Sequence, residues 1–136
     1  MASFIIAYRK TIANEGLYSN DTNDRGGETV LGLTRVMDKN WAGWLFIDEC
    51  KKHPSFPANL KSVEHKIDAI AQPFYKQKYW MPVRGDEIIN QDIANKIYDS
   101  CVNLGISQGI ILAQRSLGIA ETGKLNDATL NKLNNK

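Results

Sequence analysis

Three side chains that could cleave a glycosidic bond lie within one short stretch of the sequence, residues 15–34. Such cleavage needs a proton donor to the leaving oxygen and a second group that stabilises or attacks the oxocarbenium-like centre. Glu15 could be the donor, Asp24 could be the second group on the loop that follows, and the Thr29 hydroxyl could hold a water molecule. A carboxylate pair separated by roughly 6.5–9.5 Å would indicate inversion with that water as the nucleophile. Glu15, Asp24 and Thr29 are therefore the candidate catalytic residues.

The same residues have simpler interpretations. A glutamate near a helix end is usually only solvated, and a loop rich in Asn, Asp and Gly often forms nothing more than turns. A calcium loop of the EF-hand type is excluded, because Glu28 follows Asp21 too closely for the twelve-residue pattern. A zinc site is not expected, because the histidines and cysteines do not form a ligand cluster: His53, His65, Cys50 and Cys101. We expect no metal and no cofactor.

Residues 2–15 are predicted to form a helix that carries Glu15 at its end. Phe4, Tyr8 and Ile12 recur every four residues, and Glu15 lies three residues beyond Ile12 on the same face. Gly16 would then end the helix. Because Glu15 continues an apolar stripe, we expect its carboxyl to sit at the edge of the core.

The rest of the chain is predicted to form one small β element and several helices. Val30 and Leu31 favour a hairpin strand, and Thr34 could cap a second helix that runs towards Cys50. Pro73 should kink or restart the following helix. That helix is expected to open at Ser62. Further helices are expected from Gln91 to a stop at Gly105, over residues 107–117, and after a cap at Asn126. The predicted fold class is mainly α, with a small β-hairpin near Glu15.

Composition and charge narrow the class of protein. The 136 residues are 43% hydrophobic and 24% charged, with a net charge of +2, which is ordinary for a soluble globular chain. The charge is too small for a typical nucleic-acid binder. The N-terminus lacks the basic region and apolar run of a signal peptide, and no segment is apolar enough to span a membrane. We expect a monomer that is synthesised in the cytoplasm and binds neither nucleic acid nor membrane.

Residues 15–34 resemble the signature of the bacterial and phage N-acetylmuramidases of glycoside hydrolase family 108. In that family a helix ends in E-G-G-Y, followed by N-D-P-x-D-P-G-G and a T-x-x-G-I-T run. The matching segments are residues 15–18, 20–27 and 29–34. The resemblance implies a lysozyme-like α fold, hydrolysis of the β-1,4 bond between N-acetylmuramic acid and N-acetylglucosamine, and Glu15 as the catalytic acid. The order Glu, Asp, Thr is also similar to the catalytic set of phage lysozymes, which implies roles for Asp24 and Thr29.

The second half of the sequence resembles the predicted peptidoglycan-binding region that follows this motif in the family. The similar segments are residues 75–80, 98–105, 113–118 and 123–129. The resemblance divides the chain into a muramidase motif region, 1–60, and a helical peptidoglycan-binding region, 61–136. We expect the two regions to pack together as one compact domain.

Five further residues are candidates for substrate binding. Tyr18 directly follows the predicted helix end, and Asp21 lies in the loop beyond it. Trp80 could stack on a sugar ring, although an aromatic residue on a helical stripe more often belongs to the core. Asp99 and Asn103 lie four residues apart on one helix face. This pair could bind the glycan or its peptide stem, or could tie the helix to a neighbouring loop.

The sequence departs from the family motif at Leu17, Thr22, Arg25 and Glu28. Three functions therefore stay open: a muramidase, a lytic transglycosylase that needs only the glutamate, and a non-catalytic peptidoglycan-binding or secretion-assisting protein. The expected partner is the glycan strand of peptidoglycan. Without a signal peptide, the protein would reach the periplasm or cell wall through a holin or a secretion system.

Overall fold

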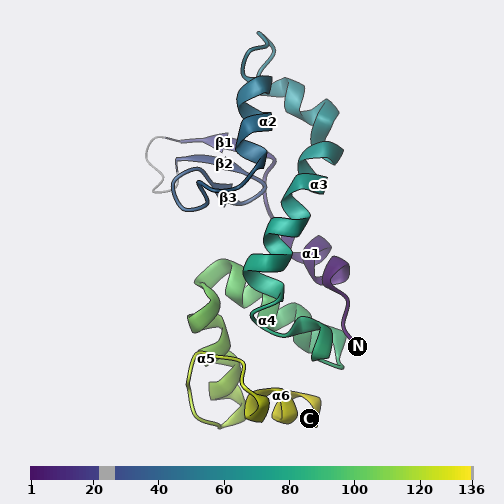
Figure 1. Cartoon of the computed structure of the whole chain (residues 1–136), viewed down its shortest axis with the longest axis vertical. Helices are drawn as coiled ribbons and strands as arrows, with labels where there is room; N and C mark the ends of the chain where they lie inside the picture. Colours follow the sequence, from purple (N-terminus) through teal and green to yellow (C-terminus); the bar gives the residue numbers. More distant parts are fainter. Residues whose placement is uncertain (22–26, 136) are drawn as a thin grey trace. The chain divides into compact units, whose positions relative to one another are not determined.

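The computed structural model describes residues 1–21 and 27–135 of the chain (Figure 1). Contacts between residues divide the chain into two compact units. The helical unit consists of Met1–Thr11 and Tyr75–Lys136, and the sheet unit consists of Ile12–Phe74. The boundary between the two units follows Phe74, and residues 1–11 group with the C-terminal half. The division into a motif region, 1–60, and a peptidoglycan-binding region, 61–136, stays a prediction. The fold class is mainly α with one small antiparallel sheet, as the sequence predicts.

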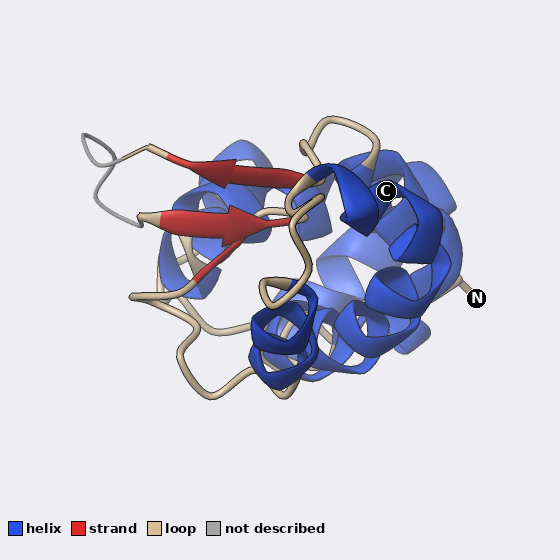
Figure 2. Cartoon of the chain, turned by 90° about the horizontal axis from the view of Figure 1, so that it is seen from above, coloured by secondary structure: helices blue, strands red, loops and turns tan. Residues whose placement is uncertain are grey.

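The sheet unit contains three short antiparallel strands, drawn in red in Figure 2. β1 (Tyr18–Asn20) pairs with β2 (Glu28–Val30), and β2 pairs with β3 (Leu33–Thr34). Leu31 and Gly32 form the turn between β2 and β3, and both have positive φ, 47° and 83°. Positive φ at both central residues is the type I′ pattern, whose twist suits a hairpin. The predicted hairpin is confirmed, and a third strand extends it.

Two buried indoles hold the start of α2 (Gly43–Cys50) in the core of the sheet unit. The rings of Trp41 and Trp44 meet edge to face, with centroids 5.2 Å apart. The Trp44 indole N–H donates to the carbonyl of Asp38 (2.9 Å), and that of Trp41 donates to the carbonyl of Ile70 (3.3 Å). Each buried indole therefore has a partner for its polar edge, as aromatic core residues require.

Thr34 does not cap the second helix, contrary to the sequence prediction. Its hydroxyl accepts a hydrogen bond from the Met37 N–H (3.1 Å), while the Asp38 carboxylate accepts one from the Thr34 N–H (3.0 Å). The two side chains close a turn that precedes α2. The helix itself begins after Ala42, which provides no side-chain cap. The competing local bonds of Thr and Asp explain the error, because they stabilise turns as readily as helix starts.

Pro73 lies inside α3 (Glu64–Tyr75) and does not restart it. A 3₁₀-helix, Ala58–Val63, precedes α3, so the helix opens two residues later than Ser62. A π-helical segment, Lys76–Trp80, follows α3 directly. Pro73, which has no N–H to donate, thus lies within α3, three residues before the change to π geometry.

In the helical unit, α4 (Gln91–Leu104) and α5 (Ile106–Leu117) pack closely and are joined by Gly105 alone. Gly105 has φ of 96°, which stops α4 where the sequence predicts. A Cβ added at Gly109 would lie 2.5 Å from the Cys101 Sγ and 2.8 Å from the Cys101 backbone, so only glycine fits this contact. Burial raises the pKa of the Cys101 thiol to about 12, so Cys101 is an unreactive core residue.

Hydrogen bonds attach α1 (Phe4–Ile12) to α4 at both of its ends. The Ser3 N–H donates to the Gln91 Oε1 (2.7 Å), and the Thr11 hydroxyl donates to the Asp99 Oδ1 (3.0 Å). These contacts explain why the first helix belongs to the helical unit.

The C-terminal helix α6 (Asp127–Asn134) begins at the predicted cap, Asn126. The Asn126 Oδ1 accepts a hydrogen bond from the Thr129 N–H (2.9 Å). The buried Gln114 side chain of α5 donates to the Thr129 hydroxyl (3.0 Å) and to the carbonyl of Lys124 (3.0 Å). The side-chain amide thus secures α6 and the loop before it against α5.

Replacing Tyr98 with phenylalanine is expected to raise the free energy of unfolding by about 1 kcal/mol. The Tyr98 ring packs edge to face against Phe4 and Trp80, but its buried hydroxyl has no hydrogen-bond partner among the described residues. Removing an unsatisfied buried group relieves its desolvation cost while the ring contacts remain. Urea unfolding of the two proteins measures the difference. A destabilised variant would contradict the claim that the Tyr98 hydroxyl has no hydrogen-bond partner.

Candidate active site

Glu15 lies in the bend that joins α1 to β1. The helix ends at Ile12 rather than at residue 15, and the Glu15 N–H donates to the Ile12 carbonyl (2.9 Å). Such a bond tightens the last turn of a helix. Two residues later, the Leu17 carbonyl accepts a hydrogen bond from the Leu31 N–H (3.2 Å). The half-buried Glu15 is therefore held by backbone bonds on both sides, which restricts where its carboxyl can reach.

The leucine at position 17 is compatible with this backbone. Among the described residues only Leu31 and Arg84 combine a side chain with positive φ, so Leu17 does not occupy a conformation that favours glycine. Gly16 also lacks a positive φ, and a Cβ there would meet no atom within 4 Å. In contrast, Gly27 has φ of 62°, so the second glycine of the Gly-Gly pair is needed by the backbone. The departure at Leu17 therefore introduces no backbone strain.

Thr29 occupies the middle of β2, opposite Ser19 on β1 and Thr34 on β3. Its half-buried side chain alternates with those of Glu28 and Val30, so it points to the opposite face of the sheet. The Thr29 hydroxyl donates to the Gly27 carbonyl (3.2 Å), which leaves its lone pairs able to accept a hydrogen bond from water. Asp21 is exposed just beyond β1. Asp24 lies outside the described residues.

Tyr18 and Glu28 form a side-chain contact across the β1–β2 ladder. The Tyr18 hydroxyl donates to the Glu28 Oε2 (2.7 Å), and the Tyr18 ring meets that of Phe56 edge to face at 5.0 Å. Burial, together with the hydrogen bond and negative charge of Glu28, raises the pKa of Tyr18 above its usual value. The hydroxyl therefore keeps its proton. Tyr18, a predicted substrate-binding residue, is thus held in place by the Glu28 carboxylate. In the sequence, Glu28 is notable only as a departure from the family motif.

Two cations compensate the buried charge of Glu28, whose side chain is 8% exposed. Lys51, which directly follows α2, places its Nζ 2.6 Å from the Glu28 Oε2, and Arg35 places its Nε 3.6 Å from the Oε1. Arg35 also makes a bidentate contact with Asp48 of α2 (2.6 and 2.8 Å) and covers the Trp44 ring. These bonds attach the sheet to α2. One signal for these contacts is visible in the sequence, because Asp48 and Lys51 are three residues apart and therefore lie close together at the end of α2.

The predicted binding residues of the helical unit have structural contacts. The Asp99 carboxylate accepts from the Thr11 hydroxyl and from the Asn103 Nδ2 (3.2 Å), so it ties α1 to α4. Asn103 is exposed. Trp80 is 1% exposed, and its indole N–H donates to the Asp86 carboxylate (2.9 Å). In this conformation the Trp80 ring offers no open face to a sugar.

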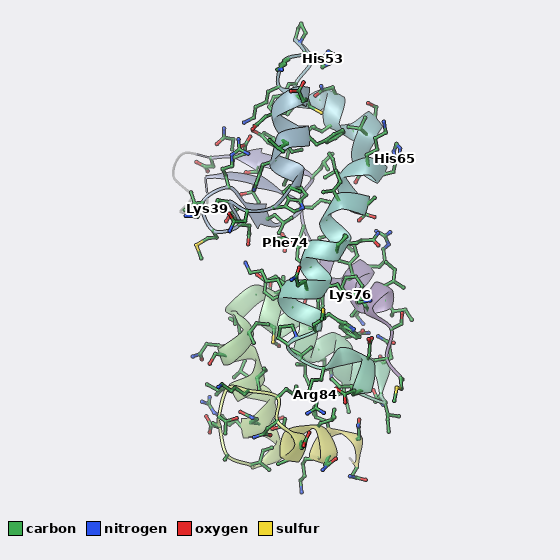
Figure 3. All side chains as sticks on the ribbon, viewed as in Figure 1. Lys39, His53, His65, Phe74, Lys76 and Arg84 are labelled. Carbon is green, nitrogen blue, oxygen red and sulfur yellow. The ribbon has the colours of Figure 1, made fainter. Side chains whose placement is uncertain are left out.

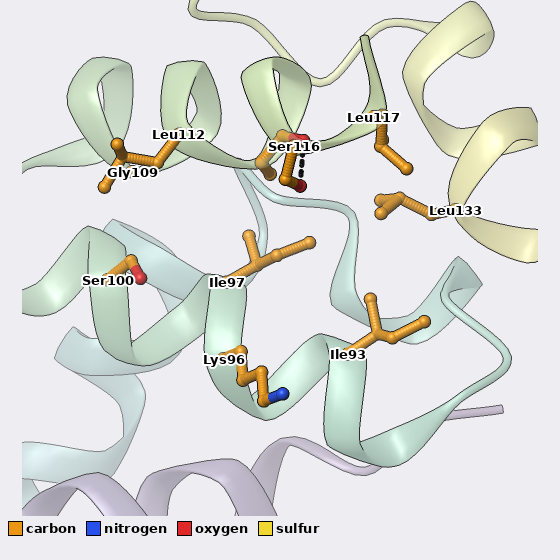
Figure 4. A pocket seen from close by; sticks show the side chains of 10 residues that line it. Ile93, Lys96, Ile97, Ser100, Gly109, Leu112, Ser116, Leu117 and Leu133 are labelled. Atoms are coloured by element: carbon orange, nitrogen blue, oxygen red, sulfur yellow. Dashed lines mark hydrogen bonds between the residues drawn. The ribbon is translucent and has the colours of Figure 1, made fainter. Parts of the chain in front are cut away.

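Two pockets lie away from the predicted catalytic residues. One, of about 390 Å³, lies among α4, α5 and α6, where aliphatic side chains such as Ile93, Ile97 and Leu112 surround it (Figure 4). The other, of about 380 Å³, lies beside α2 and the 3₁₀-helix in the sheet unit. None of the candidate site residues lines either pocket, so neither is the predicted active site.

His53 lies in the loop after α2, and His65 lies near the start of α3 (Figure 3). Over residues 1–21 and 27–135, no group of three or more His, Cys, Asp or Glu side chains is arranged to hold a metal ion. Within the same residues, no helix is long and apolar enough to cross a membrane.

Comparisons with known proteins place these features in a family. The family model described as Glycosyl hydrolase 108 matches residues 8–105, which include Glu15, Tyr18 and Thr29. Residues 106–136 lie outside the match, so the peptidoglycan-binding region stays a prediction. A solved structure, SagA of Brucella abortus, is similar with a TM-score of 0.66 and 21% identity, over 98% of this chain and 69% of SagA. No curated protein matches.

The likeness to SagA concerns the fold, which is the expected mainly α, lysozyme-like arrangement with a small sheet. The family match covers well over half of the chain and contains the whole stretch from which the chemistry was predicted. The chain therefore belongs to the glycosyl hydrolase 108 family.

Proposed function

We propose that this glycosyl hydrolase cleaves the β-1,4 bond between N-acetylmuramic acid and N-acetylglucosamine in peptidoglycan, with Glu15 as the general acid. The position of Glu15 carries the proposal. Its half-buried side chain follows the end of α1, and backbone bonds at Glu15 and Leu17 fix it beside the sheet. A general acid must be held within hydrogen-bond reach of the leaving oxygen. The resemblance of residues 15–34 to the muramidase signature supports the same assignment.

The proposed reaction is a hydrolysis. Glu15 gives its proton to the glycosidic oxygen while the bond from that oxygen to the anomeric carbon breaks. Water adds to the anomeric carbon and loses a proton to the solvent, from which Glu15 regains its own, so that both products end in hydroxyl groups. Asp24 positions this water or stabilises the positive charge on the sugar ring, and Thr29 holds the water through the free lone pairs of its hydroxyl. Tyr18 and Asp21, close to Glu15 in sequence, contact the sugar.

The residues of the helical unit have a different part in the proposal. Asp99 and Asn103 position α1 through the bond of Asp99 to Thr11, and Trp80 stabilises the core. The substrate would be reached in the periplasm or cell wall, after passage through a holin or a secretion system. The proposed partner is the glycan strand.

Release of soluble fragments from purified sacculi tests the proposed function. A muramidase releases muropeptides that end in reducing N-acetylmuramic acid. A lytic transglycosylase would leave anhydro-muramic ends and would use no water. A chain that binds sacculi but releases nothing would be a non-catalytic peptidoglycan-binding or secretion-assisting protein, and the proposal would be wrong.

Replacing Thr29 with valine is expected to lower the hydrolysis rate by about 10- to 100-fold, because the water would lose its anchor. Valine has the same shape and suits a strand, so the fold should be retained. Thr29→Ser is the matched control, because it keeps the hydroxyl and should retain most of the rate. Initial rates of muropeptide release measure the effect. Equal rates for the valine and serine variants would remove Thr29 from the mechanism.

A further inference from the structure

Tyr18 lies three residues after Glu15, and its hydroxyl forms a hydrogen bond with Glu28. The surroundings of Glu28 determine which of the two groups is the donor. The Glu28 carboxylate has two cationic partners, Lys51 at 2.6 Å and Arg35 at 3.6 Å. A carboxylate in such surroundings can only accept hydrogen bonds. The proton in the 2.7 Å contact therefore belongs to the Tyr18 hydroxyl.

A phenol has a single proton to donate. Because Tyr18 donates this hydrogen bond to Glu28, its oxygen can only accept from any other partner, one of which is the side chain of Asn20. The Tyr18 side chain is half-buried, whereas Glu28 is almost fully buried. A ligand at Tyr18 would therefore meet a hydrogen-bond acceptor. With an apolar residue in place of Glu28, the same hydroxyl could donate instead.

We propose that Glu28 is a specificity-determining positioning residue, which makes the Tyr18 oxygen an acceptor for N–H or O–H groups of the glycan. The N-acetylated sugars of the strand carry such donors in their acetamido groups and ring hydroxyls. Carbonyl and carboxylate groups of the substrate are disfavoured at the same point, because they would face lone pairs. The inference rests on the proposed function, since it names how the same site recognises its substrate.

Substitutions at Glu28 differ in whether they keep an acceptor for Tyr18 and for the cation Lys51. Glutamine keeps an oxygen where both Tyr18 and Lys51 need an acceptor, so Glu28→Gln should preserve the direction of the bond. Methionine has a similar length but offers no comparable acceptor, so Glu28→Met frees the Tyr18 proton. Lys51 is 36% exposed and can be solvated when its partner is removed.

The test measures binding of peptide-free glycan strands to Glu15→Gln protein, which cannot turn them over. In this background Glu28→Met is expected to weaken binding about three- to tenfold, the effect of one lost hydrogen bond. Glu28→Gln should bind as the parent does. Tyr18→Phe removes the acceptor and should weaken binding at least as much as Glu28→Met, which only frees the hydroxyl to donate. The double variant Tyr18→Phe/Glu28→Met should be no weaker than Tyr18→Phe, because Glu28 acts only through the Tyr18 hydroxyl.

Additive losses in the double variant, or unchanged binding by Glu28→Met, would overturn the role of Glu28 while leaving the proposed function intact. A parent protein that binds no glycan strands would contradict both. The ring signals of Tyr18 provide a readout that does not depend on binding. Titration by NMR should show a lower pKa of Tyr18 in Glu28→Met than in the parent, because the carboxylate raises that pKa. Thermal unfolding of each variant confirms that it is folded.

Discussion

Replacing Glu15 with glutamine is expected to lower muropeptide release from purified sacculi by about 100- to 10,000-fold, the usual contribution of a general acid. Glutamine has the shape of glutamate but no acidic proton to give to the leaving oxygen. The backbone bonds that fix this position come from the Glu15 N–H and the Leu17 carbonyl, and the substitution removes neither. The variant should therefore fold and bind sacculi as the parent does.

Glu49→Gln is the matched control for this prediction. Glu49 is an exposed residue of α2 in the same unit, and its carboxylate pairs only with the nearby Lys52 in the described contacts (3.0 Å). The same chemical change at this surface site should leave the rate within twofold of the parent rate. A Glu15→Gln protein that kept more than a tenth of the parent rate would mean that another group donates the proton.

Replacing Trp80 with alanine is expected to cost about 3–5 kcal/mol of the free energy of unfolding. The indole is 1% exposed and packs against Phe4 and Tyr98, with ring centroids 5.8 and 5.9 Å away. Gly85 lies so close that an added Cβ would collide with the ring. The alanine variant would lose these contacts and leave the Asp86 carboxylate without its indole donor. Urea unfolding measures the loss.

Trp80→Phe separates packing from sugar binding. Phenylalanine keeps most of the apolar contact but loses the bond to Asp86, so its destabilisation should be smaller than that of alanine. Both variants should bind sacculi normally under conditions in which they are folded. If alanine left stability unchanged and weakened binding, Trp80 would be a sugar ligand, the role that its aromatic ring allows.

Local signals in the sequence were sufficient for much of the fold. Gly105 and Asn126 mark helix boundaries because their chemistry acts within a few residues, through a positive φ and a side-chain cap. The apolar stripe continues to Glu15 and so predicts an end of α1 that is three residues too late, because the backbone already turns after Ile12. At Thr34 a turn and a helix start compete for the same side-chain bond, and the sequence alone did not distinguish them.

The candidate site was only partly predictable. Glu15, Tyr18 and Thr29 were identified because they fall within one continuous motif. Glu28 gained its role from partners elsewhere in the chain, Lys51 directly after α2 and Arg35 after β3. Such pairings depend on how the sheet meets the helix, and spacing along the chain does not show them. The burial of Trp80 likewise follows from its packing with Phe4, which lies far away in the sequence.

Digestion of purified peptidoglycan in water labelled with oxygen-18 tests the central claim most directly. If Glu15 drives hydrolysis of the proposed bond, mass spectrometry should find one labelled oxygen at a reducing N-acetylmuramic acid end of each new fragment. The Glu15→Gln protein should release almost no such fragments. Unlabelled anhydro-muramic ends, or label at N-acetylglucosamine ends, would contradict the account.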